Sequence, residues 1–194
     1  MLSNIPEIEV GQFVLRGMEL DDAPDMFEFM SDRETMKYIT PNPVKNVEEM
    51  KEYILSCIDR FKREKEIPWV IVDKKTNRLI GVFRLHKLHF WHKKAEMGVV
   101  IHKDFQQKRV MTEVLNEMIP YTFNVLGLNR LVGDIFANNV GSKKLLEKYG
   151  FHRDGVLRQT DFDGTNFHDT VVYSMLKDEF EELYKEKKGQ EIRY

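Results

Sequence analysis

The chain has 194 residues, a length that suits one domain able to bury a full core. Its 30 lysine and arginine residues are balanced by 32 aspartate and glutamate residues, and the formal net charge of -2 argues against general nucleic-acid binding. The single cysteine, Cys57, excludes an internal disulfide and a cysteine-built zinc site, and no stretch is long and apolar enough to cross a membrane. We therefore expect a cytoplasmic protein without a nucleic-acid or membrane partner.

The N-terminal half predicts a strand, two helices and three further strands. Apolar residues at helical spacing define the helices, with Asp21 or Asp22 as the cap of the first and Cys57 on the apolar face of the second. Two prolines within residues 40–44 predict the loop between the helices. The predicted ranges are 13–18 for the first strand, 21–32 and 46–65 for the helices, and 68–74, 79–89 and 94–102 for the later strands.

The C-terminal half predicts alternating helices and strands. Its first helix contains Pro120, which predicts a kink, and its second helix starts at an asparagine and stops at Gly150. The turn FDGTN joins two strands of a hairpin. The ranges are 110–123 and 138–150 for the helices, 129–137 and 154–176 for the strands, and about 177–190 for a charged terminal helix. Together the elements predict a single mixed α/β domain over residues 1–194.

Two stretches carry a resemblance to a known family. AEMGVVIHKDFQQKRVMTEVL, residues 95–115, is similar to the strand, cofactor loop and helix of the GNAT acyl-CoA-dependent N-acetyltransferases. NNVGSKKLLEKYGFHRDGVLR, residues 138–158, together with FHDTVVYSML, residues 167–176, resembles one branch of that family. This branch is the ribosomal-protein alanine (N-terminal) acetyltransferase-like group.

The resemblance implies an α/β fold with a mixed, mostly antiparallel central sheet flanked by helices. Its middle strands, here 95–102 and 129–137, are expected to splay apart and admit acetyl-CoA between them. The following loop would place its amides against the pyrophosphate at a helix N-terminus. The implied cofactor-binding residues are Val99, Val100, Gln107, Lys108, Arg109, Val110, Met111, Asn139 and Ser142.

The cofactor loop departs from the family pattern. Gln106 fits its first position, but Arg109 stands where the family has glycine, and relatives often have a second glycine at the position of Gln107. Provided that the loop keeps ordinary helical dihedrals, a side chain at these positions adds little backbone strain. We then expect a working but altered phosphate turn, in which Arg109 contributes an ion pair to the pyrophosphate.

Acetyl transfer requires a neutral amine, donors for the oxyanion and a proton for the departing thiolate. Backbone N–H groups of Val99 or Val100 are candidates for the oxyanion site. Many family members carry a tyrosine acid where this chain has Leu146, and the resembling branch implies that Ser142 donates the proton instead. Ser142 also fits the first turn of a helix capped by Asn139, a structural role that is compatible with the catalytic one.

Glu96 is the first candidate for the general base. It shares a strand face with Gly98 and Val100, and its carboxylate could accept the ammonium proton directly or through water. An ordinary ion-paired strand carboxylate explains the residue equally well. Asp134 is a second candidate, and transfer to bulk-connected water needs no dedicated base.

Three histidines invite a metal interpretation, and a few aromatic residues are candidates for the acceptor site. His86, His89 and His92 are spaced for a helix but lie in a predicted strand and turn, so we expect no metal site. Segment 33–65 should form one wall of the acceptor site, with Tyr38, Phe90 and Trp91 as further guesses.

The sequence supports two functions of different classes. The first is an acetyl-CoA-dependent N-acetyltransferase acting by direct transfer in a ternary complex. The branch implies a protein or peptide α-amine as acceptor, with polyamines and aminoglycoside-like amines as alternatives. The second is a catalytically silent acyl-CoA-binding or protein-interaction module, which Arg109 and Leu146 favour. The oligomeric state stays open, with a homodimer as one option.

Overall fold

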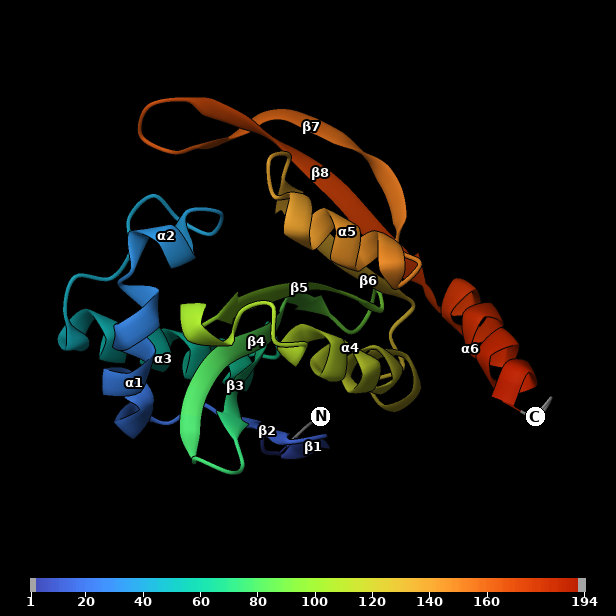
Figure 1. Ribbon diagram of the computed structural model, residues 1–194, viewed down its shortest axis with the longest axis horizontal. Coiled ribbons are helices and arrows are strands. Elements are labelled where there is room, and N and C mark those ends of the chain that lie inside the picture. Colours follow the sequence, from blue (N-terminus) through green and yellow to red (C-terminus); the bar gives the residue numbers. More distant parts are fainter. Residues whose placement is uncertain (1–2, 192–194) are drawn as a thin grey trace.

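The computed structural model describes residues 3–191, with side chains up to residue 185. Within these residues the chain forms one eight-stranded sheet in the order β1-β2-β3-β4-β5-β6-β8-β7 (Figure 1). Every neighbouring pair is antiparallel except β5 and β6, which run parallel. The strands are β1 (Ile8–Val10), β2 (Phe13–Gly17), β3 (Ile67–Asp73), β4 (Arg78–His89), β5 (Lys94–Ile101), β6 (Arg130–Phe136), β7 (His152–Phe162) and β8 (Phe167–Leu176).

Helices cover both faces of this sheet (Figure 1). Helices α1 to α3 pack on one face, around a core that includes Met50, Ile54 and Cys57. Helices α4 and α5 pack on the other face, and the Tyr149 hydroxyl joins them by donating to the Thr112 carbonyl at 2.7 Å. The helices are α1 (Ala23–Met30), α2 (Arg33–Met36), α3 (Val47–Lys62), α4 (Val110–Pro120), α5 (Val140–Lys148) and α6 (Lys177–Glu191).

Strands β5 and β6 separate soon after they meet. Their pairing covers only three registers and ends at Glu96 opposite Val132. Residues of β5 beyond this point are half-buried, although strands at the centre of a sheet are normally covered on both sides. The expected splay between the middle strands is therefore confirmed, and it opens a gap in the centre of the sheet.

The element boundaries differ from the predictions at a few points. Strand β1 and the short helix α2 were not predicted, because segments of three and four residues carry too little periodicity to recognise. Pro120 ends α4 instead of kinking it, and a π-helical turn, Tyr121–Val125, follows. Asp22 makes no side-chain cap at α1; its carboxylate pairs with Arg16 at 2.6 Å.

Candidate active site

The gap between β5 and β6 leads into a cavity with a volume of about 670 Å³. Walls come from β5, the loop after it, the first turns of α4 and α5, strand β6 and the α2 region. Six of the predicted cofactor-binding positions line this single cavity: Val99, Val100, Gln107, Met111, Asn139 and Ser142. The structure thus brings together residues that lie up to 43 positions apart, from 99 to 142, on four different segments.

The splayed part of β5 supplies free backbone groups to this cleft. Backbone N–H groups of successive strand residues point to opposite edges of the strand. Because β4 pairs with Val99 and Val100 on one edge, only one of these two residues can direct its N–H group toward the open side. The oxyanion donor is therefore expected from one of them and not from both.

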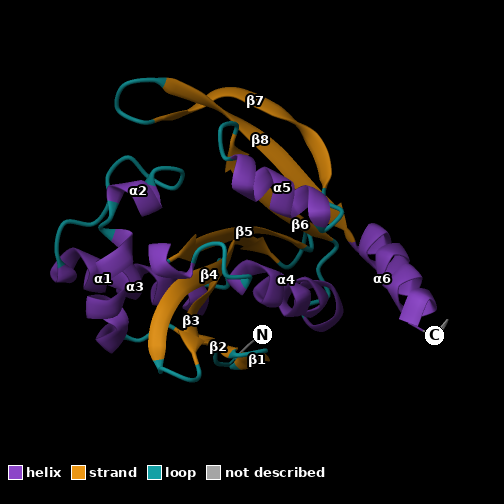
Figure 2. Cartoon of the chain, in the orientation of Figure 1, coloured by secondary structure: helices purple, strands orange, loops and turns teal. Residues whose placement is uncertain are grey.

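The loop before α4, teal in Figure 2, has an unexpected backbone conformation. Gln107 and Arg109 both adopt the left-handed region, with φ values of 59° and 63°. The condition of ordinary helical dihedrals, on which a strain-free turn depended, is therefore not met at these two positions. Glycine adopts this region without strain, whereas other residues pay roughly 1–2 kcal/mol each. The loop thus adopts a conformation that suits glycine, although Gln107 and Arg109 occupy the two positions.

The contacts around this loop stabilise its unusual conformation. The Gln106 side chain donates to the Ile101 carbonyl at 3.0 Å and so ties the loop back to the end of β5. Lys108 Nζ lies 5.4 Å from the centre of the Phe105 ring. The first amides of α4 have no partner inside the helix, as at any helix N-terminus, and can face an anion.

Three predicted loop residues lie outside the cavity wall. The side chains of Lys108 and Arg109 are exposed at its rim, and the Val110 side chain is buried in the core. Lys103, which was not predicted, lines the cavity instead. A contact of Lys108 or Arg109 with a ligand would therefore come from outside the cleft, and a contact of Val110 would come from its backbone.

The start of α5 forms the opposite wall and has ordinary geometry. Asn139 Oδ1 accepts the N–H of Ser142 at 3.1 Å, so Asn139 caps the helix as predicted. The Ser142 hydroxyl makes no hydrogen bond within the described part of the chain, which leaves it available to a ligand in the cleft. Leu146 also lines the cleft and offers no proton.

The two candidate bases have different environments. Glu96 does not line the cavity; its carboxylate pairs with Lys87 at 2.7 Å and is 20% exposed. Asp134 does line the cavity. Although Asp134 is exposed, the surrounding protein removes part of its hydration, and this raises the pKa of its carboxyl; the nearby Glu96 carboxylate raises it further.

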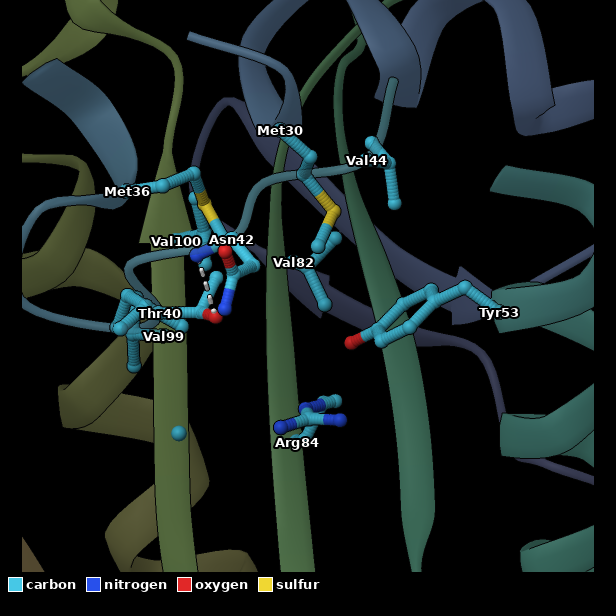
Figure 3. Close-up of a pocket in the computed structure, with 12 residues that line it drawn as sticks. Met30, Met36, Thr40, Asn42, Val44, Tyr53, Val82, Arg84, Val99 and Val100 are labelled. Carbon is cyan, nitrogen blue, oxygen red and sulfur yellow. Dashed lines mark hydrogen bonds between the residues drawn. The ribbon is translucent and has the colours of Figure 1, made fainter. Parts of the chain in front are cut away.

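A second, smaller cavity of about 290 Å³ adjoins the first (Figure 3). It lies on the face of β4 and β5 that α1 to α3 cover, and both cavities share Ile39, Gly98, Val99 and Val100. Most of its wall is apolar, but Arg84 and the Tyr53 hydroxyl meet at one side (Figure 3). Sequence reasoning missed both residues, because nothing in the local sequence links a residue of α3 to one of β4.

The three residues guessed for an acceptor wall lie in different places. Tyr38 lines the larger cavity, and its hydroxyl donates to the Asn138 carbonyl at 3.4 Å across the cleft. Phe90 and Trp91 line neither cavity. They sit in the turn before β5, at the opposite end of the strand from the splay, and Trp91 is 86% exposed.

The described residues contain no group of three or more histidine, cysteine, aspartate or glutamate side chains placed to hold a metal ion. The rings of His89 and His92 are tilted against each other with their centres 4.2 Å apart, while His86 lies further back on β4. Among the residues that the structure describes, no helix has the length and apolar character needed to cross a membrane.

A splayed sheet with a cleft between its parallel strands, and a helix N-terminus at the mouth, defines an acyl-CoA-dependent transferase of the GNAT type. The family described as the acetyltransferase (GNAT) domain matches residues 12–152, and the chain therefore belongs to this family. It is an acyltransferase, and the cosubstrate of the family is acetyl-CoA.

Similar proteins support this assignment. The uncharacterized N-acetyltransferase YoaA of Bacillus subtilis (strain 168) is 31% identical over 172 residues, which are 89% of this chain and 97% of YoaA. The spermidine N(1)-acetyltransferase of Vibrio cholerae is 25% identical and matches 87% of this chain and 95% of that enzyme. A solved ribosomal-protein α-N-acetyltransferase in complex with coenzyme A shares the fold, with a TM-score of 0.82 and 18% identity over 90% of this chain and 99% of its own.

Proposed function

We propose that this enzyme transfers the acetyl group of acetyl-CoA directly to a primary amine, with a protein or peptide N-terminal amine as its acceptor. The observation that carries the proposal is the junction of the two cavities at Gly98, Val99 and Val100. Two substrates that enter from opposite sides of the sheet would meet at this junction, as a ternary complex requires. Similar proteins that act on ribosomal proteins, and the resemblance of residues 138–158 to that branch, support the choice of acceptor.

The cofactor would lie in the larger cavity. Its thioester would be near Val99 and Val100, and its phosphates near the first turn of α4, where Gln107 to Met111 surround unpaired amides. Arg109 would add a positive charge from the rim, as would Lys108. Asn139 and Ser142 would contact the cofactor from α5.

The reaction forms one C–N bond and breaks one C–S bond. The neutral amine attacks the thioester carbon, and a β5 backbone N–H stabilises the negative charge that develops on the carbonyl oxygen. When the C–S bond breaks, the thiolate takes a proton from the Ser142 hydroxyl, which regains one from solvent. The proton lost by the amine passes through water to Glu96.

Asp134 is the second candidate for this base. It lines the cleft that Glu96 only adjoins, and its raised pKa makes it a stronger base than an ordinary aspartate. Exchanging each carboxylate for its amide, Glu96→Gln and Asp134→Asn, separates the two. The larger loss of turnover, together with loss of the acidic-side dependence of turnover on pH, identifies the base.

The proposal is tested by incubating the protein with acetyl-CoA and a panel of peptides and small amines while free thiol is measured. We expect thiol release that depends on the acceptor, with an acetylated peptide N-terminus as product by mass spectrometry. Release with small amines alone would overturn the choice of acceptor. Binding of acetyl-CoA without release for any acceptor would favour the catalytically silent module.

A further inference from the structure

The smaller cavity carries a charge that its apolar wall does not explain. Of the twelve residues that line it, Arg84 is the only one with a charged side chain, and no carboxylate faces it. Figure 3 shows the sulfur atoms of Met30 and Met36 on one side of the cavity and the Arg84 guanidinium on another, near the Tyr53 hydroxyl. Thr40, Asn42 and Tyr53 add neutral polar groups, and a cation in such a mostly apolar cavity favours an anionic guest.

The charge on Arg84 is only partly neutralised by its neighbours. Arg84 Nη1 lies 3.2 Å from Glu66 Oε1, within ion-pair distance, yet this oxygen accepts no hydrogen bond of good geometry. The other Glu66 oxygen already binds Arg60 Nε at 2.5 Å. One buried carboxylate is thus shared by two guanidinium groups, and the cluster keeps a net positive charge.

The remaining groups do not cancel this charge. Burial raises the pKa of Tyr53, so its hydroxyl stays protonated and can donate to an anion. Burial, followed by the positive charge of Arg84, lowers the pKa of His86 to about 4, so its imidazole is neutral at physiological pH. Burial also raises the pKa of the Cys57 thiol, which therefore adds no negative charge.

Arg84 is close to the point where the two substrates would meet. It pairs with Gly98 across the β4–β5 ladder, and its Nη2 lies 3.7 Å from the position that a Cβ on Gly98 would occupy. Gly98 itself lines both cavities. An acceptor whose anionic group binds Arg84 could therefore place its amine at the splay when only a few bonds separate the two groups.

We propose that the smaller cavity is the acceptor pocket and that it selects an amine with an apolar group of one residue's size and a nearby carboxylate, which pairs with Arg84. The inference rests on the proposed function. Two sources offer this chemistry: a free amino acid with its α-carboxylate, and a peptide N-terminus with an acidic residue near the amine. Polyamines, whose additional ammonium groups would meet Arg84, are expected to be poor acceptors.

The test compares matched acceptors by kcat/KM, calculated for the neutral amine. Leucine and 3-methylbutylamine differ only in the carboxylate, and peptides beginning Met-Asp and Met-Asn differ only in a side-chain charge. In at least one pair, we expect the kcat/KM of the member with the additional carboxylate to be about tenfold higher than that of its partner. This factor corresponds to one charge-assisted hydrogen bond. The kcat/KM of spermidine should be lower by a larger factor. The pair that shows the difference identifies the source.

Variants then assign this preference to Arg84. Arg84→Gln should reduce the tenfold difference to about twofold by raising KM, while Arg84→Lys should retain part of it. Arg78→Gln is the matched control, because Arg78 is on the same strand but lines neither cavity. If Arg84→Gln does not fold, the ranking of acceptors by the parent protein still decides the question.

A binding measurement separates this inference from the proposed function. The probe is 4-methylpentanoate, which carries the apolar group and the carboxylate but no amine, added in the presence of coenzyme A. It should raise the melting temperature of the parent protein and not of Arg84→Gln. If it does so while no amine is acetylated, the proposed function fails and the pocket chemistry stands. If spermidine is acetylated as well as the carboxylate-bearing acceptors, the inference is overturned and the transferase stands.

Discussion

The two cavities that meet at the splay are built in different ways. The larger one is made of loops, helix starts and exposed backbone, and the few charges on its rim, such as Lys103, are accessible to solvent. The smaller one is lined mainly by side chains, from α1 to α3, the loop between α2 and α3, and strands β4 and β5, with Arg84 held against a buried Glu66. Backbone groups offer the same donors whatever the sequence, whereas a pocket of side chains changes with each substitution. This difference suits a common cosubstrate on one side and a selected acceptor on the other.

The cofactor side should show the largest single effect, at Ser142. If its hydroxyl protonates the leaving thiolate, Ser142→Ala should lower kcat by roughly 100-fold with little change in acetyl-CoA affinity. Single-turnover kinetics and calorimetric titration measure the two quantities. Ser56→Ala, on α3 and outside both cavities, is the control. Unchanged turnover with a lower melting temperature would show that Ser142 only supports the start of α5.

The acceptor side should show a dependence of stability on pH, through His86. The pKa of His86 is about 4 in the folded protein and about 6.5 in an unfolded chain, so the unfolded state binds more protons between these values. Its contribution to stability is therefore present above about pH 6.5 and is lost as the pH falls toward 4. Between pH 7 and 4.5, the free energy of unfolding of the parent should fall by on the order of 2 kcal/mol more than that of His86→Gln.

Urea unfolding at the two pH values measures this difference. His152→Gln removes an exposed histidine and is the matched control, which should behave as the parent does. If the free energy of unfolding falls equally in the parent and in His86→Gln, then His86 is hydrated in the folded state. The acceptor pocket would then be wetter than its apolar wall indicates.

A smaller effect is expected at the rim of the cofactor side. Arg109→Glu should weaken acetyl-CoA binding by about tenfold, because like charges in a partly solvated site repel by about 1–2 kcal/mol. Arg109→Gly should instead keep most of the affinity and reduce its dependence on salt. Arg63→Glu makes the same charge change at an exposed residue directly after α3 and controls for net charge. Equal binding by Arg109→Glu and the parent would place Arg109 away from the phosphates.

The smallest effect concerns the left-handed residues of the same loop. Gln107→Gly and Arg109→Gly should each raise the free energy of unfolding by about 0.5 kcal/mol, since relief of left-handed strain slightly exceeds the entropy that glycine loses on folding. Gln106→Gly is the matched control, because its φ of -65° is ordinary and its side chain binds the Ile101 carbonyl. It should lower stability. A lower free energy of unfolding for all three variants would show that side-chain contacts of Gln107 and Arg109 outweigh their backbone strain.

Most of the predicted cofactor-binding residues line the larger cavity, whereas Arg84 and Tyr53 of the smaller cavity were not predicted. Asn139 was recognised as a cap, and Val99, Gln107 and Ser142 were placed at one site, because a strand, a loop and a helix start are local patterns. The left-handed backbone at Arg109 was not predicted, since arginine rarely adopts it and only the closure of the loop on Ile101 imposes it.

The sequence by itself determined the family, the order of the elements and the position of the splay, all of which depend on local periodicity and on a recognisable stretch of chain. Tertiary structure alone decided that Tyr53, Glu66 and Arg84 share one cluster beside Gly98. These residues come from α3, the segment after it and β4, and the register of β4 against β5 is set by packing over the whole sheet. Their mutual charges become strong only where folding removes water, a condition that no single stretch of sequence records.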